Sequence, residues 1–167
     1  MQFSEHEMEF KTETQKQAYE KMRDHLTALF GEINVKEMDD ALMLQEGSTF
    51  IYLRAFPIGE NKAGVEVFSY VAVDVDVTED LMRFLLTYNL KLILGAFGMS
   101  IGENGKGTIV LTHTILGDTM ERDELYGSVS AIARVSDDMD DQIVKMFGGA
   151  TALSRMMKIQ SPTEVWE

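Results

Sequence analysis

The chain has 167 residues, no cysteine, and 28 acidic against 15 basic side chains, which gives a formal net charge of −13. The lack of cysteine excludes disulfides, thiolate catalysis and cysteine-ligated metal centres, and the negative charge argues against nucleic acid as a partner because it repels phosphate backbones. The sequence shows neither a signal-peptide pattern nor the roughly 20 consecutive apolar residues of a membrane span, so we expect a cytoplasmic protein that does not bind membranes.

The first predicted element is a helix over residues 14–30. Apolar residues recur at three- and four-residue spacing from Tyr19 to Phe30, and Gly31 follows as a stop. Residues 1–13 are expected to form an N-terminal tail and residues 158–167 a C-terminal tail. Residues 14–157 are expected to form a single domain, because no interruption between them is long enough to separate two.

Three strands are predicted next, over residues 41–44, 49–58 and 65–75. Gly59, Glu60, Asn61 and Lys62 accept turn geometry, so the second and third of these strands are expected to form a hairpin. Short connections make all three strands antiparallel.

The strand over residues 65–75 is apolar on both faces. Five valines between Val65 and Val75 share one face, interrupted by Ser69, and Phe68, Tyr70 and Ala72 share the other. A sheet covered by helices on one side alone normally alternates more cleanly. The second face is therefore expected to meet another protein chain, either a twin subunit or a client, and a loop or terminus folded over it is the alternative.

A second helix is predicted over residues 79–89, with Thr78 as its N-cap. This helix is apolar almost all round, which indicates that it is covered on both sides. We therefore predict a dimer interface here, with deep burial inside one subunit as the competing explanation. The predicted interface residues are Leu81, Phe84, Leu85 and Tyr88.

Two more strands are predicted, over residues 96–101 and 108–116, around an Asn-Gly pair that favours a hairpin turn. A long helix follows from Asp118 or Thr119 to Phe147, where Asp118 and Glu121 have capping-box spacing. Ser136 or Asp137 could instead begin a separate helix. A short helix over residues 150–157 ends the predicted domain.

No motif in the sequence indicates catalysis or metal binding. His6, His25 and His113 have no partner at metal-ligand spacing, and His113 is expected to be a buried imidazole. The carboxylates between Asp137 and Asp141 lack the pattern of a calcium loop and are interpreted as a solvated helix face. We therefore expect no catalytic residues, no cofactor and no metal, although an enzyme using Asp74, Asp76 and His113 is kept as a third hypothesis.

The chain resembles a known family from Thr78 onward. The resemblance depends on Asn89, Gly95, Phe97 and the ending Phe147-Gly148-Gly149, and it points to the YbjN family, whose fold is similar to that of the type III secretion chaperones. The resemblance implies an α+β subunit of order α-β-β-β-α-β-β-α, with an antiparallel sheet packed against helices. It also implies a homodimer that binds protein and has no catalytic residues.

The leading hypothesis is a non-enzymatic, chaperone-like homodimer that binds a segment of another protein through apolar sheet surface, using aromatic contacts. The alternative is a sensory or regulatory module that binds a small ligand between a helix and the sheet. The sequence does not identify the client or the ligand. The residues predicted to contact the partner are Phe50, Tyr52, Phe56, Phe68 and Tyr70.

Overall fold

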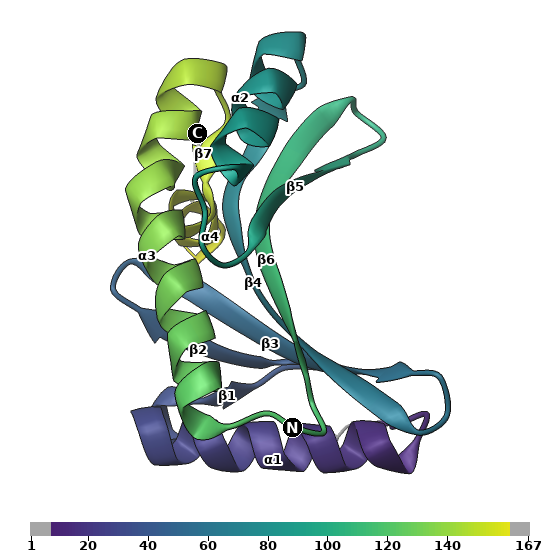
Figure 1. The fold of residues 1–167 in the computed structure, drawn as a ribbon. Helices are drawn as coiled ribbons and strands as arrows, with labels where there is room; N and C mark the ends of the chain where they lie inside the picture. The colour runs from purple at the N-terminus through teal and green to yellow at the C-terminus, as the bar shows by residue number, and fades with distance from the viewer. Residues whose placement is uncertain (1–7, 161–167) are drawn as a thin grey trace.

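The computed structural model describes residues 8–160, which form an α+β fold (Figure 1). The helices are α1 (Glu13–Phe30), α2 (Glu79–Asn89), α3 (Arg122–Phe147) and α4 (Ala152–Gln160), with a short 3₁₀ helix η1 (Glu32–Asn34). The strands are β1 (Lys36–Glu37), β2 (Leu42–Glu46), β3 (Thr49–Ile58), β4 (Lys62–Asp76), β5 (Ala96–Ile101), β6 (Lys106–Leu116) and β7 (Ala150–Thr151). None of the helices within residues 8–160 is long and apolar enough to cross a membrane.

The seven strands form one antiparallel sheet. Its order is β1-β2-β3-β4-β6-β5, and β7 pairs with β4 beside the path of the other strands. The predicted order of helices and strands and the antiparallel sheet are confirmed. The two predicted hairpins are also present, since β3 pairs with β4 and β5 pairs with β6.

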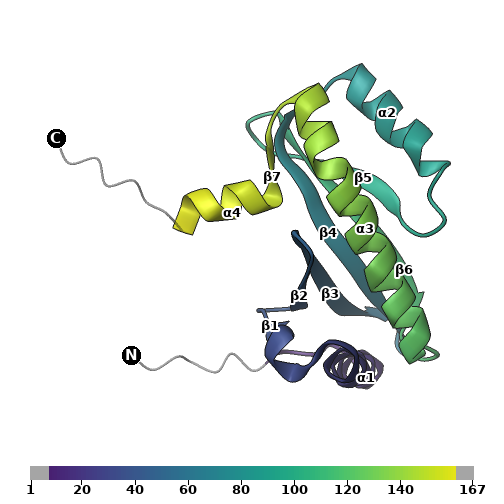
Figure 2. The ribbon, with the colours of Figure 1, turned by 90° about the vertical axis from the view of Figure 1, so that its left-hand side faces the viewer.

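The core lies between one face of the sheet and the helices α1 and α3 (Figure 2). Every second residue of β3 and β6 points into this core, as a strand period of two requires. Leu53 and Leu111 are fully buried on that face, and they pack with the fully buried Met22 of α1 and Ile132 of α3. The opposite face of the sheet carries the alternate side chains.

Strand β4 departs from the alternation predicted for it. A register shift between Tyr70 and Ala72 places Ala72, rather than Val71, opposite the core residue Ile109. A second irregularity follows before Val75, at Asp74, whose φ of 56° lies in the left-handed region. The five valines therefore do not share one face along the whole strand, because each bulge reverses the side to which the following residues point.

The helix α3 begins later than predicted. It begins at Arg122, and its N-cap residue Glu121 makes no side-chain capping hydrogen bond, so the capping box expected from Asp118 is wrong. The chain first carries Met120 into the core, where that side chain is fully buried. The helix then continues to Phe147 without a break at Ser136, which is itself buried.

Part of the predicted N-terminal tail packs against the domain. Met8 and Phe10 are partly buried against the core, and the ring of Phe10 lies 5.3 Å from that of Tyr19. Thr12 caps α1 by accepting a hydrogen bond from the backbone N–H of Gln15. Residues 1–7 of that tail, and residues 161–167 of the C-terminal tail, lie outside the described residues.

Candidate functional site

All five residues predicted to contact a partner lie on the face of the sheet opposite α1 and α3, which we call the open face. Phe50, Tyr52 and Phe56 come from β3, and Phe68 and Tyr70 come from β4. The residues between them on β3 point the other way and are buried in the core. The period of two along a strand and the pairing of β3 with β4 thus bring these aromatic side chains onto one surface.

Three of these aromatic rings form a cluster. The Tyr52 ring is 5.4 Å from the rings of both Phe68 and Tyr70, and Phe68 and Tyr70 are 5.7 Å apart. Phe68 is covered by its neighbours and is 8% exposed, whereas Tyr70 is 41% exposed. Burial, and secondarily the charge of Tyr70, raise the pKa of the Tyr52 hydroxyl. The cluster therefore presents the accessible ring of Tyr70 beside Tyr52 and over a buried phenylalanine.

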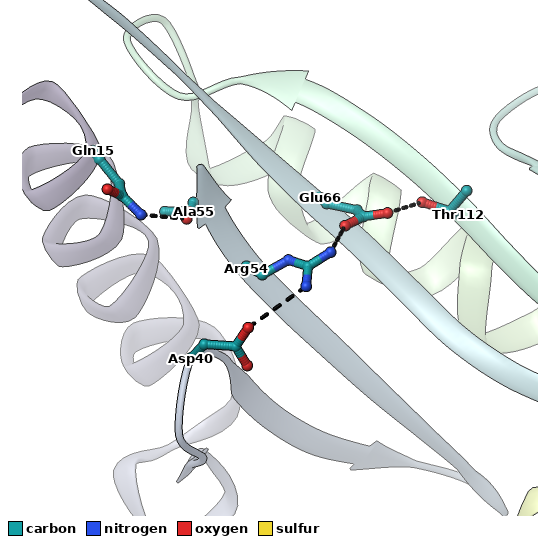
Figure 3. Close-up of polar contacts among 6 residues, drawn as sticks. All are labelled: Gln15, Asp40, Arg54, Ala55, Glu66 and Thr112. Carbon is teal, nitrogen blue, oxygen red and sulfur yellow. Dashed lines mark hydrogen bonds and ion pairs between the residues drawn. The ribbon is translucent and has the colours of Figure 1, made fainter. Parts of the chain in front are cut away.

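A row of polar side chains crosses the open face beside the cluster (Figure 3). Arg54 donates a hydrogen bond of 2.7 Å to Glu66, and Thr112 donates one of 2.9 Å to the other oxygen of Glu66. Asp40, in the β1–β2 loop, lies 3.5 Å from Arg54, and the bond to Glu66 raises the pKa of the arginine. Arg54 also lies 5.5 Å from the centre of the Phe68 ring. This network joins three strands and fixes a charged pair next to an aromatic surface.

Phe56 lies over Gly64, its partner on β4. A Cβ atom at Gly64 would stand 2.4 Å from the Phe56 ring, so a side chain there would push the ring away. Glycine at this position therefore allows the ring to cover the backbone of the neighbouring strand.

The C-terminal segment borders one end of the open face. β7 pairs with Ala72 and Val73 of β4, and Arg155 of α4 forms an ion pair of 2.6 Å with Asp74. Leu153 of α4 lines a small hollow with Phe50 and Tyr70. The alternative expectation was a loop or terminus folded over this face. The C-terminal segment covers one end of the face only, and Tyr70 stays accessible.

The predicted dimer-interface residues divide into two pairs. Leu81 and Leu85 are buried inside the chain, with 0% and 5% exposure, so they have no surface to offer a second subunit. This corrects the prediction for these two residues and agrees with the competing explanation of burial within one subunit. Phe84 and Tyr88 are partly buried, with their rings 5.8 Å apart.

The exposed apolar residues of α2 lie on another side of the helix. Met82, Leu86 and Leu90, at four-residue spacing, are 43%, 70% and 88% exposed. Residues four apart on a helix lie above one another, so these three form a stripe, which we call the α2 stripe. Sequence reasoning missed it because the helix is apolar on nearly every side.

The three residues of the enzyme hypothesis do not meet. Asp74 is bound by Arg155, and Asp76 lies opposite Lys106 and forms an ion pair of 2.5 Å with it. His113 is seven positions beyond Lys106 on the same strand, which is a separation of about 23 Å at the usual rise per residue. His113 is also half-buried rather than fully buried. Among residues 8–160, no group of three or more histidine, aspartate and glutamate side chains could hold a metal ion.

One carboxylate of the predicted solvated face of α3 is partly buried. Burial raises the pKa of Asp140, the backbone N–H of Asp141 lowers it, and the charges of Asp141 and Asp137 raise it further. A carboxyl group with a raised pKa in the folded state destabilises that state at any pH where it is ionised.

We therefore expect Asp140→Asn to increase the free energy of unfolding at pH 7. The increase should shrink as the pH falls toward the ordinary carboxyl pKa, because Asp140 is then protonated in both states. Urea unfolding at several pH values measures this, with the exposed Asp138→Asn as the control. A gain that grows on acidification would contradict the assignment.

A hollow of about 630 Å³ lies between α1 and the strands β1 and β2. This is the place where the small-ligand alternative would put its ligand, between a helix and the sheet. The residues that line it are Arg23, Asp24, Thr27, Ala28, Glu32, Val35, Glu37 and Leu42. Four of these eight residues are charged and none is aromatic, unlike the open face.

One protein-family model matches most of this chain. Residues 16–155 match the model described as "T3SS (YopN, CesT) and YbjN peptide-binding chaperone 1". The chain belongs to this family. The matched region includes all of the sheet and both aromatic strands of the open face, so the resemblance seen in the sequence is confirmed.

Two solved structures share the fold of this chain. The crystal structure of YbjN from E. coli matches with a TM-score of 0.55 and 13% identity, over 77% of this chain and 93% of that chain. A chain of the ExsC–ExsE complex matches with a TM-score of 0.54 and 14% identity, over 73% of this chain and 92% of that chain. No curated protein sequence matches the chain. At these identities the likeness establishes the fold.

Proposed function

We propose that the protein is a non-enzymatic, chaperone-like homodimer that binds a segment of another protein on the open face. The observation that carries this proposal is the aromatic cluster of Tyr52, Phe68 and Tyr70, which is built on a rigid sheet and keeps Tyr70 accessible. Membership of a peptide-binding chaperone family supports the same function.

The chemistry of the open face suits a peptide with both apolar and polar side chains. Tyrosine rings provide large apolar contact at a small entropic cost, because each has two side-chain torsions to fix. The pair formed by Arg54 and Glu66 offers both a donor and an acceptor group at one fixed place. Apolar contact would therefore supply most of the affinity, and the charged pair would set the register of the bound segment.

The first test removes the accessible rings. We expect the double variant Tyr52→Ser, Tyr70→Ser to recover at least about tenfold less partner than the parent when the tagged protein is captured from its host, since aromatic hot spots each contribute about 2 kcal/mol or more. Mass spectrometry of the captured proteins measures the loss. Phe68 is left intact because a serine at this buried position would also destabilise the sheet.

Tyr126→Ser is the matched control, because Tyr126 is 51% exposed on α3, away from the open face. This variant should recover as much partner as the parent. Undiminished capture by the double variant, or recovery of no near-stoichiometric protein by the parent, would contradict the proposal.

The homodimer has its own support in the α2 stripe. A helix face carrying Leu86 and Leu90 largely exposed is an unfavourable surface for a monomer, and the same stripe on a twin subunit could cover it across a two-fold axis.

Light scattering at micromolar concentration should give twice the single-chain mass of 18.8 kDa. The variant Leu86→Asp, Leu90→Asp should give the single-chain mass while keeping the parent's circular dichroism. A parent protein of single-chain mass would refute the dimer, and an unchanged dimer in the variant would move the interface away from this stripe.

A further inference from the structure

A groove runs between α2 and α3 on the side of α2 away from the α2 stripe. The two helices lie side by side and run in opposite directions (Figures 1 and 2), so that the start of α2 lies beside the end of α3. The rings of Phe84 on α2 and Phe147 on α3 are 5.6 Å apart at that end. The groove lies on the helical side of the molecule and is distinct from the open face.

Two neighbouring hollows make up this groove. They measure about 350 and about 390 Å³, and they share Tyr88 and Lys91. Phe84, Tyr88 and Phe147 line the first hollow, and aliphatic side chains of the α2–β5 connection and of α3 line the second. An apolar trough of this kind, between two helices, is the receptor surface of the helix-in-groove mode of peptide recognition.

The charge of the groove is opposite to that of the molecule. Its lining holds three cations, Arg83, Lys91 and Arg134, and one carboxylate, that of Asp80, whereas acidic side chains outnumber basic ones by 28 to 15 in the whole chain. Arg83 is paired with Glu79 at 2.5 Å. Within the part of the chain that the structure describes, neither Lys91 nor Arg134 forms an ion pair.

The two free cations stand at the rim of the apolar surface. Both are exposed, and the Lys91 ammonium lies 5.6 Å from the centre of the Tyr88 ring. A partner that placed an apolar stripe in the groove, with carboxylates on either side of it, would bring those carboxylates next to Lys91 and Arg134. Charge complementarity of this kind selects one partner over another.

The walls of the groove indicate the conformation of the occupant. They are mostly helical, and the backbone groups of a helix are already bonded within it. An extended peptide would find few backbone partners there, whereas a helix satisfies its own backbone groups. The α3 residues that line the two hollows lie between Ala131 and Phe147, which are about 24 Å apart along the helix axis, a length of about four helical turns.

We propose that this groove binds an acidic amphipathic helix of a partner protein. The apolar face of that helix packs on Phe84, Tyr88 and the aliphatic lining, and its flanking carboxylates pair with Lys91 and Arg134. The protein thus has two recognition surfaces of different chemistry, an aromatic sheet face and a basic helical groove. This inference goes beyond the proposed function and stands without it.

The test selects ligands from a phage library of helical peptides about 16 residues long, using the full chain as bait. We expect the enriched peptides to carry apolar residues at positions i, i+3 or i+4, and i+7, with aspartate or glutamate beside them. Fluorescence anisotropy then measures their affinity. We expect Lys91→Glu, Arg134→Glu to weaken binding at least about tenfold.

Two control variants separate the groove from the rest of the surface. Lys36→Glu, Lys62→Glu reverses two exposed lysines on the sheet and should bind the peptides as the parent does. Tyr52→Ser, Tyr70→Ser should also leave binding unchanged, so a failure of the open face and a failure of the groove give different results.

Several results would overturn the proposal. They are a selection that enriches no peptide, enriched peptides that are basic or lack helical periodicity, and equal binding by the groove variant and the parent. A change in the light-scattering mass of Lys91→Glu, Arg134→Glu without peptide would also overturn it, because the groove would then be an interface between copies of the chain.

Discussion

The variant Gly149→Ala should lower the free energy of unfolding by about 2–5 kcal/mol. Gly149 has a φ of +83°, and a Cβ atom there would stand 2.3 Å from the carbonyl oxygen of Val73 and 2.9 Å from the amide nitrogen of Val75. The left-handed backbone alone costs an L-residue about 1–2 kcal/mol, and overpacking adds about 1–3 kcal/mol. Because both contacts are to backbone atoms of β4, no side chain can move aside to relieve them.

Gly59→Ala is the matched control for this prediction. Gly59 has a φ of +63° with open space where the Cβ would stand, so this variant should lose only the conformational cost of about 1–2 kcal/mol. Urea unfolding of the full chain compares the two, and hydrogen exchange at residues 150–160 shows whether β7 and α4 leave β4. Equal losses with unchanged exchange would contradict the role given to Gly149.

Local signals in the sequence were enough to predict most elements. The predicted range of α2 agrees with the structure at both ends, since Thr78 accepts a hydrogen bond of 3.1 Å from the N–H of Leu81 as an N-cap should. Gly31 stops α1, and its φ of 85° is one that glycine adopts readily. Capping residues, turn glycines and apolar periodicity act within a few residues of chain, and they can therefore be read without knowing the fold.

The features that the sequence did not predict depend on distant residues. The two-residue strand β7 exists because β3 no longer pairs with β4 beyond Phe68, which leaves a place beside Ala72 and Val73. The bulges of β4 likewise occur where its pairing with β6 shifts register, in the same stretch of the strand that pairs with β7. No local sequence pattern predicts which part of a strand edge will be left unpaired, because this depends on how the whole sheet is assembled.

The sequence predicted only part of the candidate site, because the rest of the site also depends on residues that are distant in the sequence. Phe50, Tyr52 and Phe56 could be named as partner contacts from a single strand, but the register that pairs Arg54 with Glu66 requires the positions of two strands. The α2–α3 groove requires the positions of two helices. The aromatic character of the open face was thus readable from single strands, whereas its polar contacts and the groove were not.

The second large effect concerns the two sides of α2. We expect Leu81→Ala to lower the free energy of unfolding by about 2–5 kcal/mol, because Leu81 is fully buried in the chain's own core and its removal leaves a cavity. Leu86→Ala, on the same helix with 70% exposure, should change the free energy of unfolding by less than about 0.5 kcal/mol. Both variants have the same helix propensity change, so the difference between them reports burial alone.

The measurement is urea unfolding at submicromolar concentration, where association contributes least to stability. Repeating it at a concentration about one hundred times higher should add stability to the parent and to Leu81→Ala, but less to Leu86→Ala, if the α2 stripe joins two subunits. A larger loss for Leu86→Ala than for Leu81→Ala at the low concentration would mean that α2 turns its other side to the core. In that case the stripe, the groove and the dimer proposal would all have to be reassigned together.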